Sequence, residues 1–303
     1  MSTPLEVVLS VRALHPKSTA GTRTVTARRY AFDHASVGPD RHWLDDDLIG
    51  SHLLAALSGV IPPGERFFAD AVRAQRHHVD GRLQEQIKGF IGQERLHQRE
   101  HDEFNHALAG LGYPTAGIDR ASQITFDLVS RLPGRTQVAF AAAAEHFTAV
   151  IAEHALEEDE LAGWQMSEAT RAFLAWHLVE ELEHRAVAFE VMQAMGVGEI
   201  ERVLAMHLAT AMMFPSVIGG LLVSLAGDRD TWHPARLLRS LGRLRRSAIA
   251  QRSFLRDLLL WNRPGFHPDQ RSIDDLLERW REQLFGTDGL VSANSRSRTS
   301  RAS

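Results

Sequence analysis

Two tetrapeptides, Glu94-Arg95-Leu96-His97 and Glu181-Leu182-Glu183-His184, each contain the pattern Glu-x-x-His. In an α-helix, positions i and i+3 share a face, so the carboxylate and the imidazole of each pattern point the same way. Two such helices, together with one Glu from each of two further helices, form the carboxylate-bridged two-metal site of ferritin-like bundles. One copy arises easily by chance, whereas two copies on separate long helices predict such a site if two further Glu residues are available.

The chain around both patterns has the character of long helices. Ile61-Pro62-Pro63-Gly64 is expected to end a first helix over 46–60, because proline lacks a backbone N–H and blocks the preceding turn. The residues 115–135 are long enough for a crossover along a bundle. The four bundle helices are predicted over 65–78, 82–111, 136–157 and 167–195. The predicted fold is all-α: a ferritin-like four-helix bundle with additional N- and C-terminal helices.

Composition and predicted helices divide the chain into four parts. Residues 1–45 are polar and irregular, with a hint of extended structure at Thr24-Val25-Thr26, and residues 46–198 form the predicted two-metal bundle. Residues 199–286 are predicted to form helices that pack on the bundle or on a membrane. Residues 287–303 are rich in Ser and Arg and are predicted to be a disordered tail.

Composition narrows the function classes. The net charge of −4 does not favour a nucleic-acid partner. The absence of Cys excludes disulfides, zinc ribbons, iron–sulfur clusters and thiol nucleophiles, and it fits a reducing cytoplasm. The first residues, Met1 to Pro4, are not followed by the apolar run of a signal peptide. We therefore expect a cytoplasmic protein, associated at most with the surface of a membrane.

A full ligand set for two metal ions is available. A lone Glu65 or Glu145 would more often be a surface charge, so the prediction rests on the ordered set. Four carboxylates and two imidazoles form an N/O donor set that suits two Fe ions, with Mn as an alternative. Because burying four carboxylates without a counter-charge is costly, a metal-free role is disfavoured. The predicted ligands are Glu65, Glu94, His97, Glu145, Glu181 and His184.

Further histidines flank this set. His177 lies one turn before Glu181 on the same stripe and is predicted as a seventh ligand. His101 lies one turn beyond His97 and is either an additional ligand or a residue that orients one. Three residues are expected behind the ligands or on the surface: His146, His154 and Glu180. The pair His77-His78 and the N-terminal histidines are expected on the surface.

These residues carry two resemblances. Over roughly residues 28–285 the sequence resembles the bacterial family labelled predicted metal-dependent hydrolases, which implies a ferritin-like metal-binding core. The motifs are Gly64-Glu65-Arg66-Phe67-Phe68, Gln93-Glu94-x-x-His97-x-x-x-His101, Glu145-His146-Phe147-Thr148 and Trp176-His177-x-x-Glu180-Glu181-x-Glu183-His184. The ligand pattern alone, with the extra His177, is similar to di-iron arylamine N-oxygenases, while the surrounding sequence does not match them.

Three functions follow as expectations. The first is a non-haem di-iron oxygenase or oxidase that uses O2 and an external electron donor to oxidise a small organic, lipophilic substrate. In it, Glu65 and Glu145 would be terminal ligands and Glu94 and Glu181 bridging ones. The alternative, which the family label suggests, is a two-metal hydrolase that attacks its substrate with a metal-bound hydroxide. The third is a non-catalytic metal-binding or membrane-associated protein.

The stretch from Val203 to Ala226 has no Asp, Glu, Lys or Arg and could span a bilayer by length alone. A basic amphipathic stretch follows as far as Arg252, as in helices that lie on anionic membranes. Pro215 and the pair Gly219-Gly220 speak against a simple spanning helix. A helix buried on all sides, or buried between the subunits of a homodimer, is favoured over membrane-surface contact through 203–252.

Overall fold

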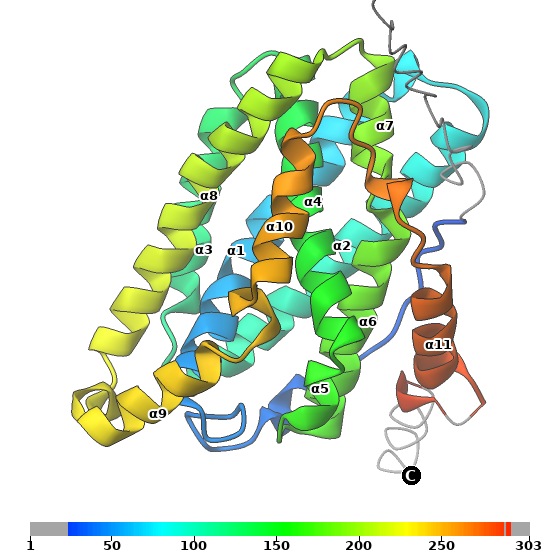
Figure 1. The fold of residues 1–303 in the computed structure, drawn as a ribbon. Coiled ribbons are helices and arrows are strands. Elements are labelled where there is room, and N and C mark those ends of the chain that lie inside the picture. Colours follow the sequence, from blue (N-terminus) through cyan, green and yellow to red (C-terminus); the bar gives the residue numbers. More distant parts are fainter. Residues whose placement is uncertain (1–23, 288, 292–303) are drawn as a thin grey trace, which may run out of the picture.

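The computed structural model describes residues 24–287 and 289–291, and over these residues it is all-α, with no strand (Figure 1). Four long helical segments pack side by side and carry the predicted ligands. They are α1 (Leu48–Gln75), α2 (Gly81–Gly110), α4 (Gly134–Glu157) and α6 (Glu168–His184), which α7 (Val187–Ala194) continues. The prediction of an all-α four-helix bundle with additional helices is confirmed.

The remaining helices cover this bundle. Helix α3 (Thr115–Val129) lies along α1, and α8 (Glu199–Ala226) packs on α1, α3 and α4. Beyond α8, α9 (Pro234–Leu244) touches the start of α1, α10 (Arg252–Leu259) covers α4, and α11 (Asp274–Phe285) packs on α6 (Figure 1). The short elements are α5 (Glu160–Gly163) and the 3-10 turns η2 (His34–Val37), η3 (Arg76–His78), η4 (Arg229–Trp232), η5 (Ala248–Ala250), η6 (Leu260–Asn262) and η7 (Pro268–Gln270).

The helix α1 corrects the prediction of a break at Pro62. It runs through both Pro62 and Pro63, so Glu65 lies inside a long helix and not at the start of a second one. Pro62 leaves the carbonyl of Ser58 without its helical N–H donor. The side chain of Asn105 on α2 donates a hydrogen bond of 2.9 Å to that carbonyl. A tertiary contact thus replaces the missing backbone bond, which no local pattern predicts.

The helix predicted over 167–195 is interrupted directly after its last ligand position. Helix α6 ends at His184 and α7 begins at Val187. Between them, Arg185 is buried and its guanidinium donates to Asp269 Oδ1 at 2.9 Å and to the carbonyl of Arg271 at 2.6 Å. These bonds fasten the turn at His184 to the segment before α11.

The N-terminal segment that the structure describes crosses α2 without forming a strand, although extended structure was expected at 24–26. It approaches α2 so closely that a Cβ at Gly89 would lie 2.1 Å from the carbonyl oxygen of Val25. Only glycine leaves room for this contact. Residues 1–23 and most of the predicted disordered tail, 288 and 292–303, lie outside the described residues.

The prediction that residues 203–226 form a helix buried on all sides is wrong for the single chain, because one side of α8 is exposed. Its inner side holds Ala205, Met206 and Ala209 against the bundle, while its outer side is exposed along the whole helix. Among the described residues it is the one helix long and apolar enough to cross a membrane, with only 17% of its most apolar window buried. Length and composition alone are weak evidence for a membrane span.

Candidate metal centre

The structure brings the seven predicted ligands together in the middle of the bundle. Glu65 comes from α1, Glu145 from α4, and the two Glu-x-x-His patterns from α2 and α6. Every one of these side chains is buried, the most exposed being His177 at 6%. The ligand stripes on the four helices therefore face one another, as the helical spacing predicts.

The side chains form two overlapping groups. In the first, one ligand atom from each residue lies within 4.8 Å of the others: Glu65, His97, His177 and Glu181. The second meets the same criterion: Glu94, His97, Glu181 and His184. Glu181 and His97 belong to both groups, which places them between two candidate ion positions. Glu145 adjoins the second group, with its Oε2 3.0 Å from Nδ1 of His184.

Seven buried polar atoms of the predicted ligands form no hydrogen bond of good geometry with any described residue, although some of them lie close to one another. They are Glu65 Oε2, Glu94 Oε1 and Oε2, His97 Nδ1, Glu145 Oε2, and His184 Nδ1 and Nε2. Buried polar atoms in proteins are almost always paired, because an unpaired one costs about 1–3 kcal/mol. So many unpaired oxygen and nitrogen atoms around one point fit a position that cations fill.

The pKa shifts of the four buried carboxylates also fit a position that cations fill. Burial, and then the charges of neighbouring carboxylates, raise the pKa of Glu65 and Glu94 well above the usual value. Burial also raises the pKa of Glu145. For Glu181 burial acts upward too, but the neighbouring His184 and His97 outweigh it and hold its pKa well below the usual value. Two divalent ions would supply the positive charge that these carboxylates lack.

His97 is oriented by a carboxylate on its far side. Its Nδ1 faces the centre, 3.5 Å from Glu181 Oε1, while its Nε2 lies 3.1 Å from Oε2 of Glu180. Burial lowers the pKa of His97, but the neighbouring carboxylates of Glu180 and Glu181 raise it to about 9. A carboxylate behind a histidine is the usual partner of a metal-binding imidazole.

Glu180 is itself held in a buried ionic network. Arg28 donates to Glu180 at 3.2 Å and to Glu183 at 2.8 Å. Gln93 and Arg281 also donate to Glu183, at 2.9 and 2.8 Å. Four supporting residues were not predicted from the sequence: Arg28, Gln93, Glu183 and Arg281. The available signal was the i, i+3 spacing of Glu180 and Glu183, which forms a second acidic stripe beside the ligands.

His101 lies behind His177 and belongs to neither group of ligand atoms. Its Nε2 is 3.2 Å from Nδ1 of His177, and its Nδ1 is 2.8 Å from Oγ of Ser58. Both of its ring nitrogens are thus occupied, while Nε2 of His177 points to Glu181 at 3.5 Å. Burial, and then the charge of His97, lower the pKa of His177 to about 3, which keeps it in the neutral form that binds metals.

The other histidines lie away from the centre. His146 and His154 are buried against α10, where their Nε2 atoms lie 3.1 Å from the carbonyl of Leu258 and from Asp257. The surface prediction is right for His77 and His78. It is wrong for His34, which is buried 3.0 Å from Glu100. Its partner Glu100 is far along the chain, so no local pattern marked it.

Comparison with known proteins agrees with this geometry. The model of the family described as "Predicted metal-dependent hydrolase" matches residues 26–272, and the chain belongs to this family. No curated protein and no solved structure matches the chain.

Proposed function

We propose that this member of the predicted metal-dependent hydrolases is an enzyme whose bundle core holds two divalent metal ions. The proposed ligands are Glu65, Glu94, His97, Glu145, His177, Glu181 and His184. Glu181 would bridge the two ions because it belongs to both groups of ligand atoms. Glu94 would share this role, with Glu65 and Glu145 as terminal ligands at opposite ends. His101 is proposed to orient His177.

The observation that carries this proposal is the set of unpaired ligand atoms in the core. The same side chains in a purely structural role would be paired with one another or with Arg. An all-N/O set rich in carboxylate suits Fe or Mn better than soft-ligand metals. Aromatic rings wall the ligands, with Trp176 at 4.8 Å and Phe90 at 5.0 Å, between ring centroids, from His97 and His184 respectively.

The reaction that we propose first is hydrolysis, because the family description supports it better than it supports oxygen chemistry. Two metal ions lower the pKa of a bound water and stabilise charge on the substrate. In this chain the carboxylates would balance the charge of the ions, and Glu180 would fix the orientation of His97. The buried aromatic walls would exclude bulk water from the reacting groups.

The second candidate is an O2-dependent oxidation of a small organic substrate, with electrons from an external donor. The observation that favours it is the donor set, four carboxylates in a four-helix core, which is the arrangement of di-iron carboxylate proteins. His177 would add a third nitrogen donor, because its Nδ1 is held by His101 at 3.2 Å and its Nε2 faces Glu181 Oε1 at 3.5 Å.

Metal titration and activity screening test both candidates. Metal-free protein is titrated anaerobically with Fe(II) and with Mn(II), and the bound metal is counted. We expect two ions per chain, and a loss of both in the double variant Glu94→Gln with Glu181→Gln. The matched control is Glu100→Gln, a buried carboxylate of α2 that pairs with His34 and lies outside the centre.

The loaded protein then separates the reactions. Turnover of ester or phosphoester substrates without O2 consumption supports hydrolysis. Rapid O2 consumption by the Fe(II) form, absent from the double variant, supports the oxidation. If neither the wild-type protein nor Glu100→Gln binds metal, the metal centre and both reactions are refuted.

A further inference from the structure

The outer side of α8 is an uncharged apolar stripe that none of the described residues covers. Ile200, Leu204, Phe214, Ile218 and Leu222 recur at the spacing of one helical face and are 46–79% exposed. His207 and Ala211 fill the same stripe between them. A helix that is apolar all round is normally covered on every side, so we expect a binding partner to cover this stripe.

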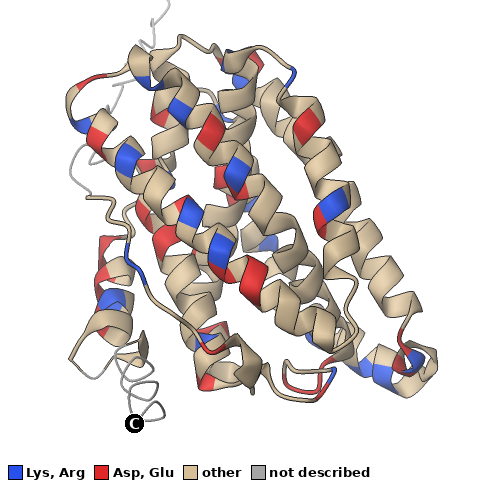
Figure 2. Cartoon of the chain, turned by 180° about the vertical axis from the view of Figure 1, so that it is seen from behind, with Lys and Arg blue, Asp and Glu red and all other residues tan. Residues whose placement is uncertain are grey.

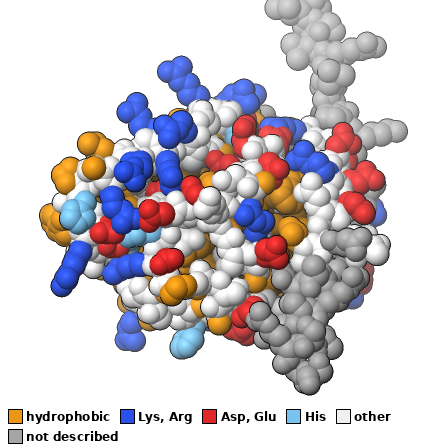
Figure 3. Space-filling view, turned by 90° about the horizontal axis from the view of Figure 1, so that it is seen from below, with side chains coloured by type: hydrophobic (Ala, Val, Ile, Leu, Met, Phe, Trp, Pro, Cys, Tyr) orange, Lys and Arg blue, Asp and Glu red, His pale blue; other side chains and the backbone are white. Residues whose placement is uncertain are grey.

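The end of α8 leads into a basic rim. Trp232 in η4 is 74% exposed and Leu238 on α9 is 68% exposed, so apolar side chains continue beyond the stripe. The basic rim runs through the same part of the chain, from η4 over α9 to the start of α10. Its exposed arginines form no ion pair with any described residue: Arg229, Arg239, Arg245, Arg246 and Arg252. Figure 2 shows Lys and Arg on α9, and Figure 3 shows them gathered around hydrophobic side chains at this end of the molecule.

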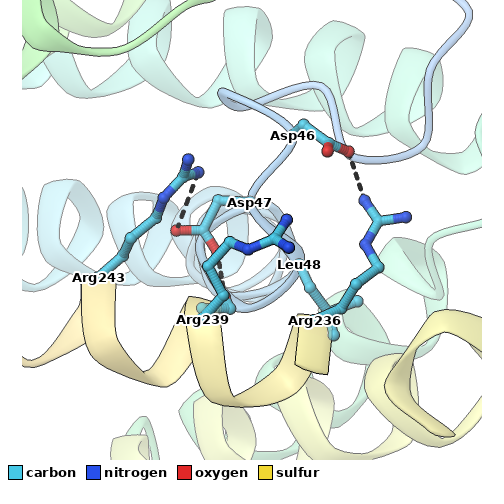
Figure 4. Close-up of a pocket in the computed structure, with 7 residues that line it drawn as sticks. Asp46, Asp47, Leu48, Arg236, Arg239 and Arg243 are labelled. Carbon is cyan, nitrogen blue, oxygen red and sulfur yellow. Dashed lines mark hydrogen bonds and ion pairs between the residues drawn. The ribbon is translucent and has the colours of Figure 1, made fainter. Parts of the chain in front are cut away.

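The local acidic residues are occupied on the inner side of α9. Arg236 pairs with Asp46, and Arg243 pairs with Asp47 at 4.0 Å (Figure 4). Arg243 also pairs with Asp45 at 3.2 Å. Ser240 accepts a hydrogen bond of 2.7 Å from the backbone N–H of Ile49. These bonds fix α9 on the start of α1 and use up the carboxylates of that segment. The outward arginines therefore keep a positive charge that no described carboxylate balances.

We propose that this surface, the α8 stripe with the basic rim of η4 and α9, docks on an anionic phospholipid bilayer. Apolar side chains, a tryptophan and arginines are the combination that binds the boundary between acyl chains and anionic headgroups. A second copy of the chain fits less well, because a two-fold contact centred on the rim would oppose arginines to arginines without carboxylates between them. Lipid phosphates supply the missing charge.

Vesicle co-sedimentation with the metal-loaded full chain tests this inference. The probes are vesicles of phosphatidylcholine alone and vesicles with about one-third phosphatidylglycerol. We expect binding to the anionic vesicles only, weakened by high salt. Arg239→Gln with Arg246→Gln should lower the affinity roughly 30-fold, since each basic side chain near the surface contributes about one factor of five. Arg82→Gln, an exposed arginine of α2, is the matched control and should leave binding unchanged.

A second pair of variants separates the stripe from the rim. Ile218→Ser with Leu222→Ser should weaken vesicle binding without changing metal content, which also shows that the variant is folded. Equal binding to both vesicle types would overturn the proposal. So would a failure to bind lipid together with a dimer mass in solution that these two serines abolish, because that result assigns the surface to a second copy.

Discussion

Two of the buried clusters of acidic and histidine side chains among the described residues differ in how their atoms are paired. In the candidate metal centre, seven ligand atoms of five residues have no hydrogen-bond partner among the described residues. In the cluster around Asp228, the carboxylate lies 3.0 Å from both His42 and His52 and 3.2 Å from Arg41. His52 is also bonded to Ser224 at 2.6 Å. Residue type and proximity alone therefore do not mark a metal site.

The pairing of the polar atoms distinguishes the candidate metal centre from the cluster around Asp228, which supports the fold. The cluster of His42, His52 and Asp228 satisfies the same distance criterion as the centre. The guanidinium of Arg41 occupies the position beside Asp228 where a cation would bind, and the cluster ties α1 to the end of α8. In the centre, by contrast, no Arg or Lys among the described residues forms an ion pair with Glu65, Glu94, Glu145 or Glu181, whose charged neighbours are histidines. The following experiments test this difference, beginning with the largest expected effect.

Metal removal should affect only the centre. Two ions that bind the folded state alone, each present at about 100 times its Kd, stabilise the fold by about 5 kcal/mol. Chelation should therefore lower the Tm by about 8 °C in differential scanning calorimetry. The Glu94→Gln, Glu181→Gln protein should show no such drop. An unchanged Tm after chelation of the wild type would mean that the centre holds no stabilising ion.

Breaking the other cluster should cost stability and leave the metal content intact. Asp228→Ala removes the partner of two buried histidines and of Arg41, so the free energy of unfolding should fall by about 3 kcal/mol in urea titration. Asp127→Ala, an exposed carboxylate of α3, is the control and should change it little. Loss of metal in Asp228→Ala would contradict the separation of the two clusters.

The support behind His97 should have an intermediate effect. Glu180→Gln keeps the size of the side chain but removes the charge that orients and polarises the imidazole. We expect metal affinity to fall by 10- to 100-fold, with two ions still bound at saturation. Isothermal titration calorimetry measures both quantities. Glu183→Gln is the comparison variant, since Glu183 belongs to the same Arg28 network but does not contact His97.

The smallest effect is a pH dependence of opposite sign in the two clusters. In metal-free protein the raised pKa of Glu94 means that the folded state holds its proton more tightly, so stability is present at acid pH and falls as pH rises above about 4.5. Asp228 is the reverse: its pKa is lowered to about 2, so its contribution is lost as pH falls from about 4 toward 2. The free energy of unfolding, measured by urea titration at a series of pH values, should depend less on pH above about 4.5 in Glu94→Gln. In Asp228→Asn it should depend less on pH between about 4 and 2.

The sequence predicted the parts of this structure that local spacing determines. The two Glu-x-x-His patterns and His177 share helical faces, so their convergence followed from period and order along the chain. The break at Pro62 was predicted wrongly because Asn105, more than forty residues away, supplies the missing donor. Arg28 was missed for the same reason, since its partners Glu180 and Glu183 are more than 150 residues away. The exposure of α8 depends on how much of the bundle surface other helices cover, which periodicity does not encode.

The hydrogen bond from Asn105 to Ser58 also links the folding of two helices. With Pro62 and Pro63 in its middle, the α1 segment loses two backbone donors and is a poor helix when isolated. Its second half, with Glu65, therefore becomes helical only when α2 is docked. Amide hydrogen exchange in α1 and α2 should consequently proceed through one joint opening. Each such opening withdraws Glu65 together with Glu94 and His97, so bound metal would slow exchange on both helices at once.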